Sequence, residues 1–181
     1  DAIEINISCP NVKGGLEFSR EPDSVSAVVS AVKKKTSKPV ITKLSPNVKD
    51  ICEIAIAAQE AGSDAVALVN TFTGMAIDIG TRRPVLGNIV GGLSGPAIRP
   101  VALRMVWETA GRVRIPVIGM GGIMDYEDAL GFLIAGASAV QIGTANFVNP
   151  RAAAEIIAGI EDYMRRNKMA NMKELTGCLK A

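Results

Sequence analysis

Two stretches of the sequence share one pattern: "AAQEAGSDAVALVN" at residues 57–70 and "FLIAGASAVQIG" at residues 132–143. Each begins as the end of a helical pattern, passes through a glycine and continues as a short apolar run. Glycine suits the left-handed turn that ends a helix, and a brief run rich in valine and alanine is typical of a buried strand. The two stretches therefore predict repeated β/α units that build a parallel sheet.

The same alternation extends along the whole chain. Short apolar runs that end in small or polar residues predict five strands, at 3–8, 40–44, 65–70, 117–121 and 139–143. Longer patterns predict helices at 23–35, 50–61, 100–113, 126–135 and 151–167, and a short helix near 172–179. We expect Asp23, Asp50 and Asp125 to cap helix starts, and Gly62 and Gly136 to follow helix ends.

Two α/β architectures are compatible with this alternation. A flavodoxin-like sheet uses five β/α units, whereas a (β/α)8 TIM barrel needs eight strands. The sequence pattern alone leaves this choice open. The chemistry at the predicted strand ends favours the barrel, because barrels place their functional residues where strands end and βα loops begin.

Composition excludes several classes of function. The 181 residues suit one domain, and the net charge of +2 with a single basic cluster at residues 33–35 argues against nucleic-acid binding. No apolar run approaches membrane-spanning length, so we expect no membrane role. The three cysteines form no CxxC pair, and we therefore expect no metal site, a reducing compartment and a cytoplasmic location.

Polar and small residues gather at the predicted strand ends. The first strand ends with Asn6, Cys9 and Asn11, the second carries Lys43, and the third ends with Asn70-Thr71. A lysine inside an apolar strand either points into the barrel mouth towards an anion or points outward and reaches solvent. The coincidence at successive strand ends favours a functional site over ordinary turn chemistry.

Glycine turns follow the last two strands, in "IGMGGI" and "QIGTANF". Glycine lets backbone amides approach a ligand closely, and barrels commonly bind phosphate between the loops after strands seven and eight, beside a short extra helix. We expect residues 145–148 to form that helix. The segment 72–97 is long for a βα connection, which indicates a lid, a binding loop or a small subdomain over the barrel mouth.

The motifs "NISCPN", "KLSPNV", "VNT", "GGLSGPAIRPVAL", "IGMGGI" and "GASAVQIGTA" resemble, in order, the class 1 dihydroorotate dehydrogenases, and most closely the catalytic subunit of subclass 1B. The flavin half of dihydropyrimidine dehydrogenase is similar and remains a rival. The resemblance implies an FMN-containing (β/α)8 barrel that oxidises dihydroorotate to orotate in pyrimidine biosynthesis.

The resemblance also implies a role for individual residues. Cys9 matches the catalytic base, which explains a thiol between carboxamides in a chain without histidine. Asn6, Asn11, Asn70 and Thr71 match residues that bind the pyrimidine. The positions that match flavin contacts are Asn6, Lys43, Val69, Gly95, Gly121, Gly122, Gly143 and Thr144.

Subclass 1B enzymes pair with a second subunit that carries FAD and a 2Fe–2S cluster and passes electrons to NAD. The resemblance therefore implies a homodimer or a heterotetramer with such a subunit, whose cofactors this chain would not bind. The chain starts at the family's fourth strand, so we expect residues 1–181 to be the C-terminal part of one barrel domain, either a portion of a longer polypeptide or a true fragment. A fragment that serves only as a non-catalytic interaction module is the alternative from a different functional class.

Overall fold

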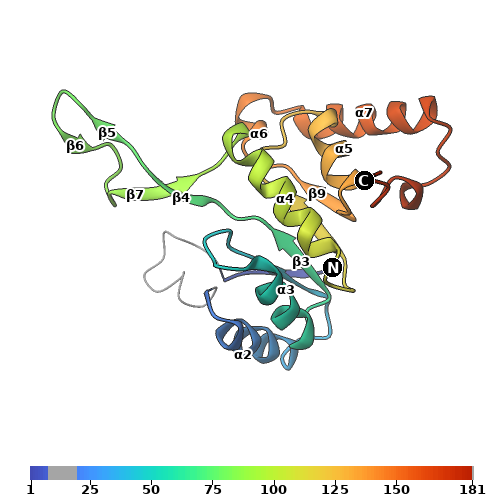
Figure 1. The fold of residues 1–181 in the computed structure, drawn as a ribbon, viewed down its shortest axis with the longest axis horizontal. Helices are drawn as coiled ribbons and strands as arrows, with labels where there is room; N and C mark the ends of the chain where they lie inside the picture. Colours follow the sequence, from blue (N-terminus) through green and yellow to red (C-terminus); the bar gives the residue numbers. More distant parts are fainter. Residues whose placement is uncertain (8–19, 181) are drawn as a thin grey trace.

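The computed structural model describes residues 1–7 and 20–180, and its main feature is a parallel sheet with helices, as the sequence predicts. The five strands lie in the order β1-β2-β3-β8-β9 (Figure 1). Each strand ends one or two residues before its predicted end. Their bounds are β1 Ile3–Asn6, β2 Val40–Lys43, β3 Ala65–Leu68, β8 Val117–Met120 and β9 Ala139–Gln141.

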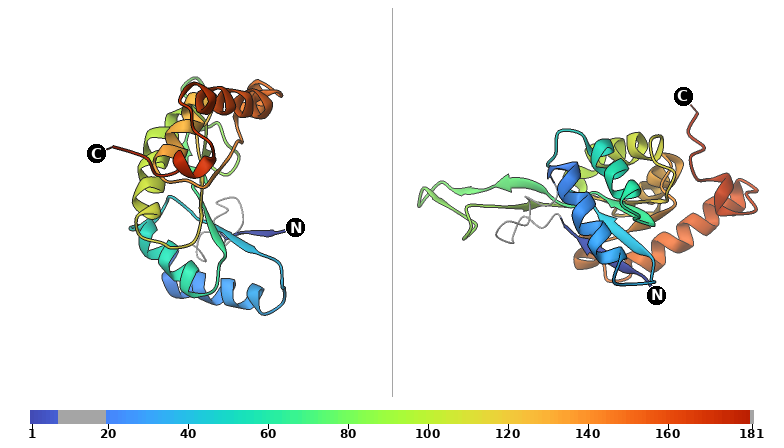
Figure 2. Two further views of the ribbon diagram at one scale, coloured as in Figure 1. Left: turned by 90° about the vertical axis from the view of Figure 1, so that its right-hand side faces the viewer. Right: turned by 90° about the horizontal axis from the view of Figure 1, so that it is seen from below.

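The strand order decides between the two architectures. Each strand of the main sheet pairs in parallel with the preceding one, and the order never reverses among the described residues. Right-handed crossovers then place the connecting helices on one face, whereas a doubly wound sheet carries helices on both faces. Figure 2 shows these helices as an arc outside the strands. The sheet is therefore five strands of a barrel wall.

A contact across the concave face shows how strongly this wall curves. Glu4 lies on β1 and Gln141 on β9, at opposite edges of the sheet. Even so, the Gln141 Nε2 donates a hydrogen bond to the Glu4 Oε2 at 2.6 Å. A flat sheet of five strands would hold its edges almost 20 Å apart. The two side chains meet because the strands bend around a common axis, as in a barrel.

Amphipathic helices cover the convex face and bury the core. In α3, Ile51, Ile54, Ala55 and Ala58 recur at spacings of three and four residues and are all buried. Phe132 of α5 is the largest fully buried side chain of the core. The helix bounds are α2 Pro22–Lys33, α3 Ile51–Glu60, α4 Arg99–Ala110, α5 Tyr126–Ile134, α6 Ala145–Val148 and α7 Ala152–Arg166.

Most of the predicted helix boundaries are confirmed by local geometry. The Asp50 carboxylate accepts a hydrogen bond from the Cys52 amide at 2.8 Å, and the Asp125 carboxylate accepts one from the Asp128 amide at 2.9 Å. Gly62 follows α3 with a φ of 97°, a conformation that glycine adopts without strain.

Two helix predictions are wrong. Asp23 does not cap α2, because Pro22 sets the helical φ one residue earlier and leaves Asp23 in the first turn. The expected helix at 172–179 is only the 3-10 turn η2, Met172–Glu174, since the chain turns at Gly177, whose φ is 70°. No helix among residues 1–7 and 20–180 is long and apolar enough to cross a membrane.

The segment predicted as a long loop forms an antiparallel arm. Strand β4 (Phe72–Met75) pairs with β7 (Val90–Leu93), and β5 (Ile77–Asp78) pairs with β6 (Arg83–Pro84). The arm extends away from the main sheet (Figures 1 and 2). Glycines at three of the eight β4–β7 positions obscure the strand pattern in the sequence. The arm exposes eight large apolar side chains, which are Met75, Ile77, Ile79, Val85, Leu86, Ile89, Val90 and Leu93.

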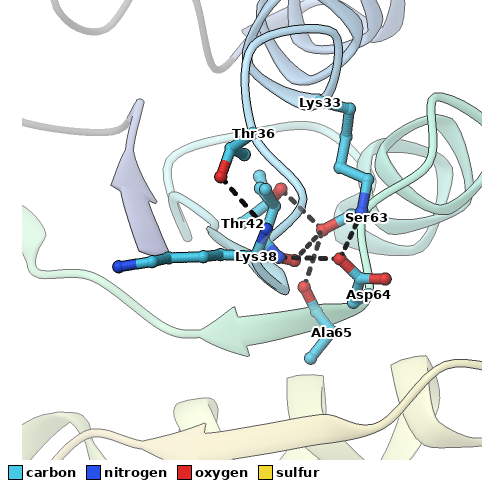
Figure 3. Close-up of polar contacts among 8 residues, drawn as sticks. Lys33, Thr36, Lys38, Thr42, Ser63, Asp64 and Ala65 are labelled. Carbon is cyan, nitrogen blue, oxygen red and sulfur yellow. Dashed lines mark hydrogen bonds and ion pairs between the residues drawn. The ribbon is translucent and has the colours of Figure 1, made fainter. Parts of the chain in front are cut away.

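A polar cluster stabilises the amino-terminal end of the sheet, where β2 and β3 begin (Figure 3). The Asp64 carboxylate accepts hydrogen bonds from the Lys33 ammonium and the Val40 amide, both at 2.7 Å. The buried Thr42 and Ser63 hydroxyls lie 2.8 Å apart, and the Ser63 hydroxyl also contacts the Ala65 carbonyl. The Lys33 ion pair and the Val40 amide lower the pKa of Asp64. These bonds join α2, β2 and β3.

Candidate functional site

A pocket of about 300 Å³ opens at the carboxyl ends of β2, β3, β8 and β9. This volume lies at the lower end of the usual range for small-molecule sites. The pocket contains nine of the residues singled out from the sequence, together with several neighbours. Its lining is Lys43, Val69, Asn70, Thr71, Ser94, Gly95, Ile98, Met120, Gly121, Gly122, Ile123, Gln141, Ile142, Gly143 and Thr144.

Lys43 lies on the concave face of the sheet. Alternation along β2 directs Thr42 to the helix side, where it is fully buried. Lys43 therefore projects to the other face, where its half-buried side chain lines the pocket. Of the two orientations open for this lysine, the one towards the barrel mouth is confirmed. Its ammonium group gives the pocket a positive charge.

Carboxamides meet above the end of β2. The Asn70 Nδ2 donates a hydrogen bond to the Asn6 Oδ1 at 3.2 Å, although 64 residues separate them. The Asn70 Oδ1 accepts one from the Thr71 amide at 2.8 Å. The structure thus brings Asn6, Asn70 and Thr71 together as the strand ends predict. Cys9 and Asn11 lie outside the described residues, and their roles stay predictions.

Glycine turns form the opposite side of the pocket. Gly121 and Gly122 have φ values of 123° and 78°, in the region that favours glycine. A Cβ at Gly122 would lie 2.7 Å from the Gly95 carbonyl oxygen, so the two loops pack too closely for any larger residue. Gly143 differs, because a Cβ there would meet no described atom within 4 Å. The backbone at Gly143 therefore borders open space in the pocket.

Two side-chain contacts join the three loops that carry these glycines. The Thr144 hydroxyl donates to the Ser94 Oγ at 2.9 Å, which links the loop after β9 to the loop after β7. Arg99, at the start of α4, forms an ion pair with Asp128 of α5. The Asp128 carboxylate, with 8% of its side chain exposed, also accepts from the Met124 amide at 2.9 Å. The loops therefore form one connected rim.

The comparison with protein families agrees with this architecture. The family model described as dihydroorotate dehydrogenase matches residues 1–164. The chain belongs to the dihydroorotate dehydrogenase family. The resemblance predicted from the sequence motifs is confirmed, and so is its subclass, because the curated relatives bear the name of the B-type catalytic subunit.

Two of these relatives show how close the similarity is. The chain is 58% identical to "Dihydroorotate dehydrogenase B (NAD(+)), catalytic subunit" of Geotalea daltonii and 59% identical to the protein of the same name from Geobacter sulfurreducens. Each match covers 98% of this chain and 59% of the relative. The chain thus spans about three fifths of the length of the curated relatives it matches.

One solved structure supports the fold of this chain. It is described as "Crystal structure of DHODH in complex with ferulenol from Eimeria tenella". The TM-score is 0.79 at 23% identity, over 98% of this chain and 54% of that one. At this identity the likeness concerns the fold alone. It confirms that the five strands belong to a barrel of the dihydroorotate dehydrogenase type.

A larger groove of about 620 Å³ lies between α3 and α4 in this family member, away from the strand ends. It contains Cys52, whose pKa is raised by burial of the thiol, so little reactive thiolate forms at neutral pH. None of the residues predicted for the site lines this groove. Among residues 1–7 and 20–180 no three His, Cys, Asp or Glu side chains lie close enough to hold a metal ion.

Sequence reasoning missed several residues of the pocket. Ser94 lies beside the predicted Gly95 in "GGLSGPA", and its hydrogen bond to Thr144 needs two loops that are 50 residues apart. Gln141 belongs to a predicted strand, but its place on the concave face depends on strand register. The carboxamide of Asn47 was a visible signal in "KLSPNV", four residues after Lys43, although no role was assigned to it.

Proposed function

We propose that the protein carrying this chain oxidises dihydroorotate to orotate with FMN as cofactor. One observation carries the proposal. Lys43, Asn70, Thr71 and the glycine turns line a single pocket at the strand ends of a chain that belongs to the dihydroorotate dehydrogenase family. The relatives that are 55–59% identical are named as NAD-dependent catalytic subunits of this enzyme.

The residues present fit a flavin phosphate and ring. A phosphate needs backbone amides without side chains above them, and Gly143 borders open space. The Thr144 hydroxyl and the Gly121-Gly122 turn lie on the same pocket wall. Val69 and Gly95 supply backbone beside it, and Lys43 supplies a cation for negative charge on the ring. A bound FMN would provide the two-electron acceptor for the hydride from C6 of the substrate.

Protein side chains perform the remaining steps in this proposal. Asn6, Asn70 and Thr71, with Asn11, hold the pyrimidine, whose edge alternates donors and acceptors as carboxamides do. The Cys9 thiolate removes the proton from C5, and the C5–C6 double bond forms as the hydride leaves C6. A free thiol ionises near pH ~8.5, so the rate should rise with pH until Cys9 is a thiolate.

The proposal extends to partners. The name of the relatives ends in "catalytic subunit", which supports an accompanying subunit. We propose that this subunit carries FAD and a 2Fe–2S cluster and delivers electrons to NAD. We also propose that two copies of the chain associate. A separate proposal is that residues 72–97 lie above the barrel mouth. The eight exposed apolar side chains of the arm support a contact with another protein surface.

An anaerobic spectrum of the complete gene product tests the proposal. Dihydroorotate should bleach the absorption of bound FMN, whereas dihydrouracil, which lacks the carboxylate, should not. Cys9→Ala should retain FMN and lose steady-state turnover near neutral pH. Bleaching by dihydrouracil alone would instead favour a dihydropyrimidine dehydrogenase-like enzyme. Absence of flavin binding would favour a non-catalytic module.

A further inference from the structure

The side chain of Asn47 continues the sheet beyond the end of β2. Strands β2 and β3 pair in parallel up to Lys43, and the Leu44 backbone still donates to the Ala67 carbonyl at 2.8 Å and accepts from the Asn70 amide at 2.9 Å. The Asn47 Nδ2 then donates to the Thr71 carbonyl at 2.9 Å. The Asn47 Oδ1 accepts from the Thr73 amide, also at 2.9 Å. Both groups of the carboxamide therefore bind the backbone that follows β3.

These two bonds reproduce the pairing of a parallel strand. In a parallel ladder, one residue donates to the carbonyl before its partner and accepts from the amide after its partner. The Asn47 carboxamide makes both bonds around Phe72, as the peptide groups of a neighbouring residue would. It therefore fixes the path of the chain between the end of β3 and the start of the arm.

Ser45 fixes the orientation of this carboxamide. The Ser45 side chain is fully buried, and its Oγ accepts from the Asn47 amide at 3.1 Å and from the Asn47 Nδ2 at 3.2 Å. The Thr71 carbonyl can only accept and the Thr73 amide can only donate. The partners thus define which end of the carboxamide is nitrogen and which is oxygen, and a carboxylate at position 47 could not satisfy them.

The contact leads directly to the residues proposed to bind substrate. Asn47 holds the carbonyl of Thr71, and the amide of Thr71 donates to the Asn70 Oδ1. The same Asn70 side chain donates to Asn6. We infer that Asn47 is a positioning residue, which holds Asn70 and Thr71 in the geometry that binds the pyrimidine. This inference rests on the proposed function.

Orotate binding to the flavin-loaded complete gene product tests the inference. Equilibrium titration of the oxidised flavin spectrum gives the orotate Kd, and flavin content and Tm are measured on the same samples. We expect Asn47→Asp, which keeps the shape and loses the donor, to raise the Kd at least tenfold. Asn47→Ala should act in the same direction, with KM raised more than kcat is lowered. Flavin content should stay at the wild-type level.

A matched variant controls for the added charge. Asn88 is exposed on the arm between β6 and β7, so Asn88→Asp makes the same chemical change away from the contact and should leave the Kd unchanged. If Asn47→Asp does not accumulate as folded protein, Ser45→Ala replaces it, with an expected rise of roughly threefold because one support of the carboxamide is lost.

The outcomes separate this inference from the proposed function. A wild type whose flavin is not bleached by dihydroorotate overturns both. A wild type that is bleached, with an unchanged orotate Kd in the position 47 variants, overturns only the inference. Loss of flavin in proportion to loss of folded protein, with a normal Kd for the remainder, also overturns it, because Asn47 would then stabilise the fold without positioning the site.

Discussion

Gly122 is packed closely against neighbouring loop backbone in the pocket, and a single methyl group there should disrupt this packing. A Cβ would lie 2.7 Å from the Arg99 Cβ, 2.7 Å from the Gly95 carbonyl oxygen and 3.0 Å from the Arg99 amide nitrogen. Two of these are backbone atoms, which cannot rotate away. Gly122 also has a φ of 78°, where an L-residue is strained by roughly 1–2 kcal/mol.

The magnitude of the effect follows from these contacts. Overpacking in a rigid environment costs about 1–3 kcal/mol, in addition to the backbone strain. We therefore expect Gly122→Ala to lower the free energy of unfolding by roughly 2–5 kcal/mol. For a protein of this size class that corresponds to a fall in Tm on the order of 10 °C. Because the loops after β7 and β8 must separate, FMN affinity should fall as well.

Substitutions at two other glycines distinguish an effect on stability from an effect on FMN affinity. Gly143 borders open pocket space, so Gly143→Ala should keep the wild-type Tm and lower FMN affinity, since the methyl group occupies the proposed phosphate cradle. Gly87, on the arm, also has no described atom within 4 Å of a Cβ, and Gly87→Ala should change neither quantity.

The assay is thermal unfolding of the complete gene product without flavin, followed by equilibrium titration with FMN. The reasoning would be refuted by a Gly122→Ala variant whose Tm lies within about 1 °C of the wild type, because the contacts described would then relax at almost no cost. A Gly143→Ala variant with wild-type FMN affinity would refute the cradle and leave the packing argument intact.

Two further predictions concern the carboxylates. Asp128→Asn should lower the free energy of unfolding by about 1–3 kcal/mol, measured in urea, because the charged contact to Arg99 is lost while the Met124 amide keeps an acceptor. Asp64 has a pKa lowered by Lys33 and the Val40 amide, so its contribution to stability is present above the unfolded value of 3.8 and is lost as pH falls through the lower folded pKa. Asp64→Asn should therefore lower the free energy of unfolding at pH 7 by on the order of 1 kcal/mol or less, because the carboxylate is exposed. The substitution should also weaken the dependence of that free energy on pH below 3.8. Equal pH profiles for the two proteins would contradict this reasoning.

Local chemistry allowed much of this fold to be predicted. Asp50 and Gly62 delimit α3 because a cap and a left-handed turn depend only on neighbouring residues. The five strands were predicted from short apolar runs, and the 145–148 helix from the short extra helix that barrels place beside a phosphate site. The arm was not, because its strands are stabilised by pairing between β4 and β7, and its glycines hide the alternation that would indicate them.

The same distinction applies to the site, because features that depend on neighbouring residues could be predicted and contacts between distant residues could not. Lys43, Asn70 and the glycine turns could be predicted, because each ends its own strand and parallel strands share one edge. Contacts such as Thr144 to Ser94 could not, since they depend on how loops 50 residues apart approach one another. Asn47 combines both cases: its motif is visible in the sequence, but its function as a substitute strand residue requires the path of Thr71 and Thr73. A polar residue in the loop after a strand, such as Asn47, can therefore extend the sheet instead of contacting the ligand.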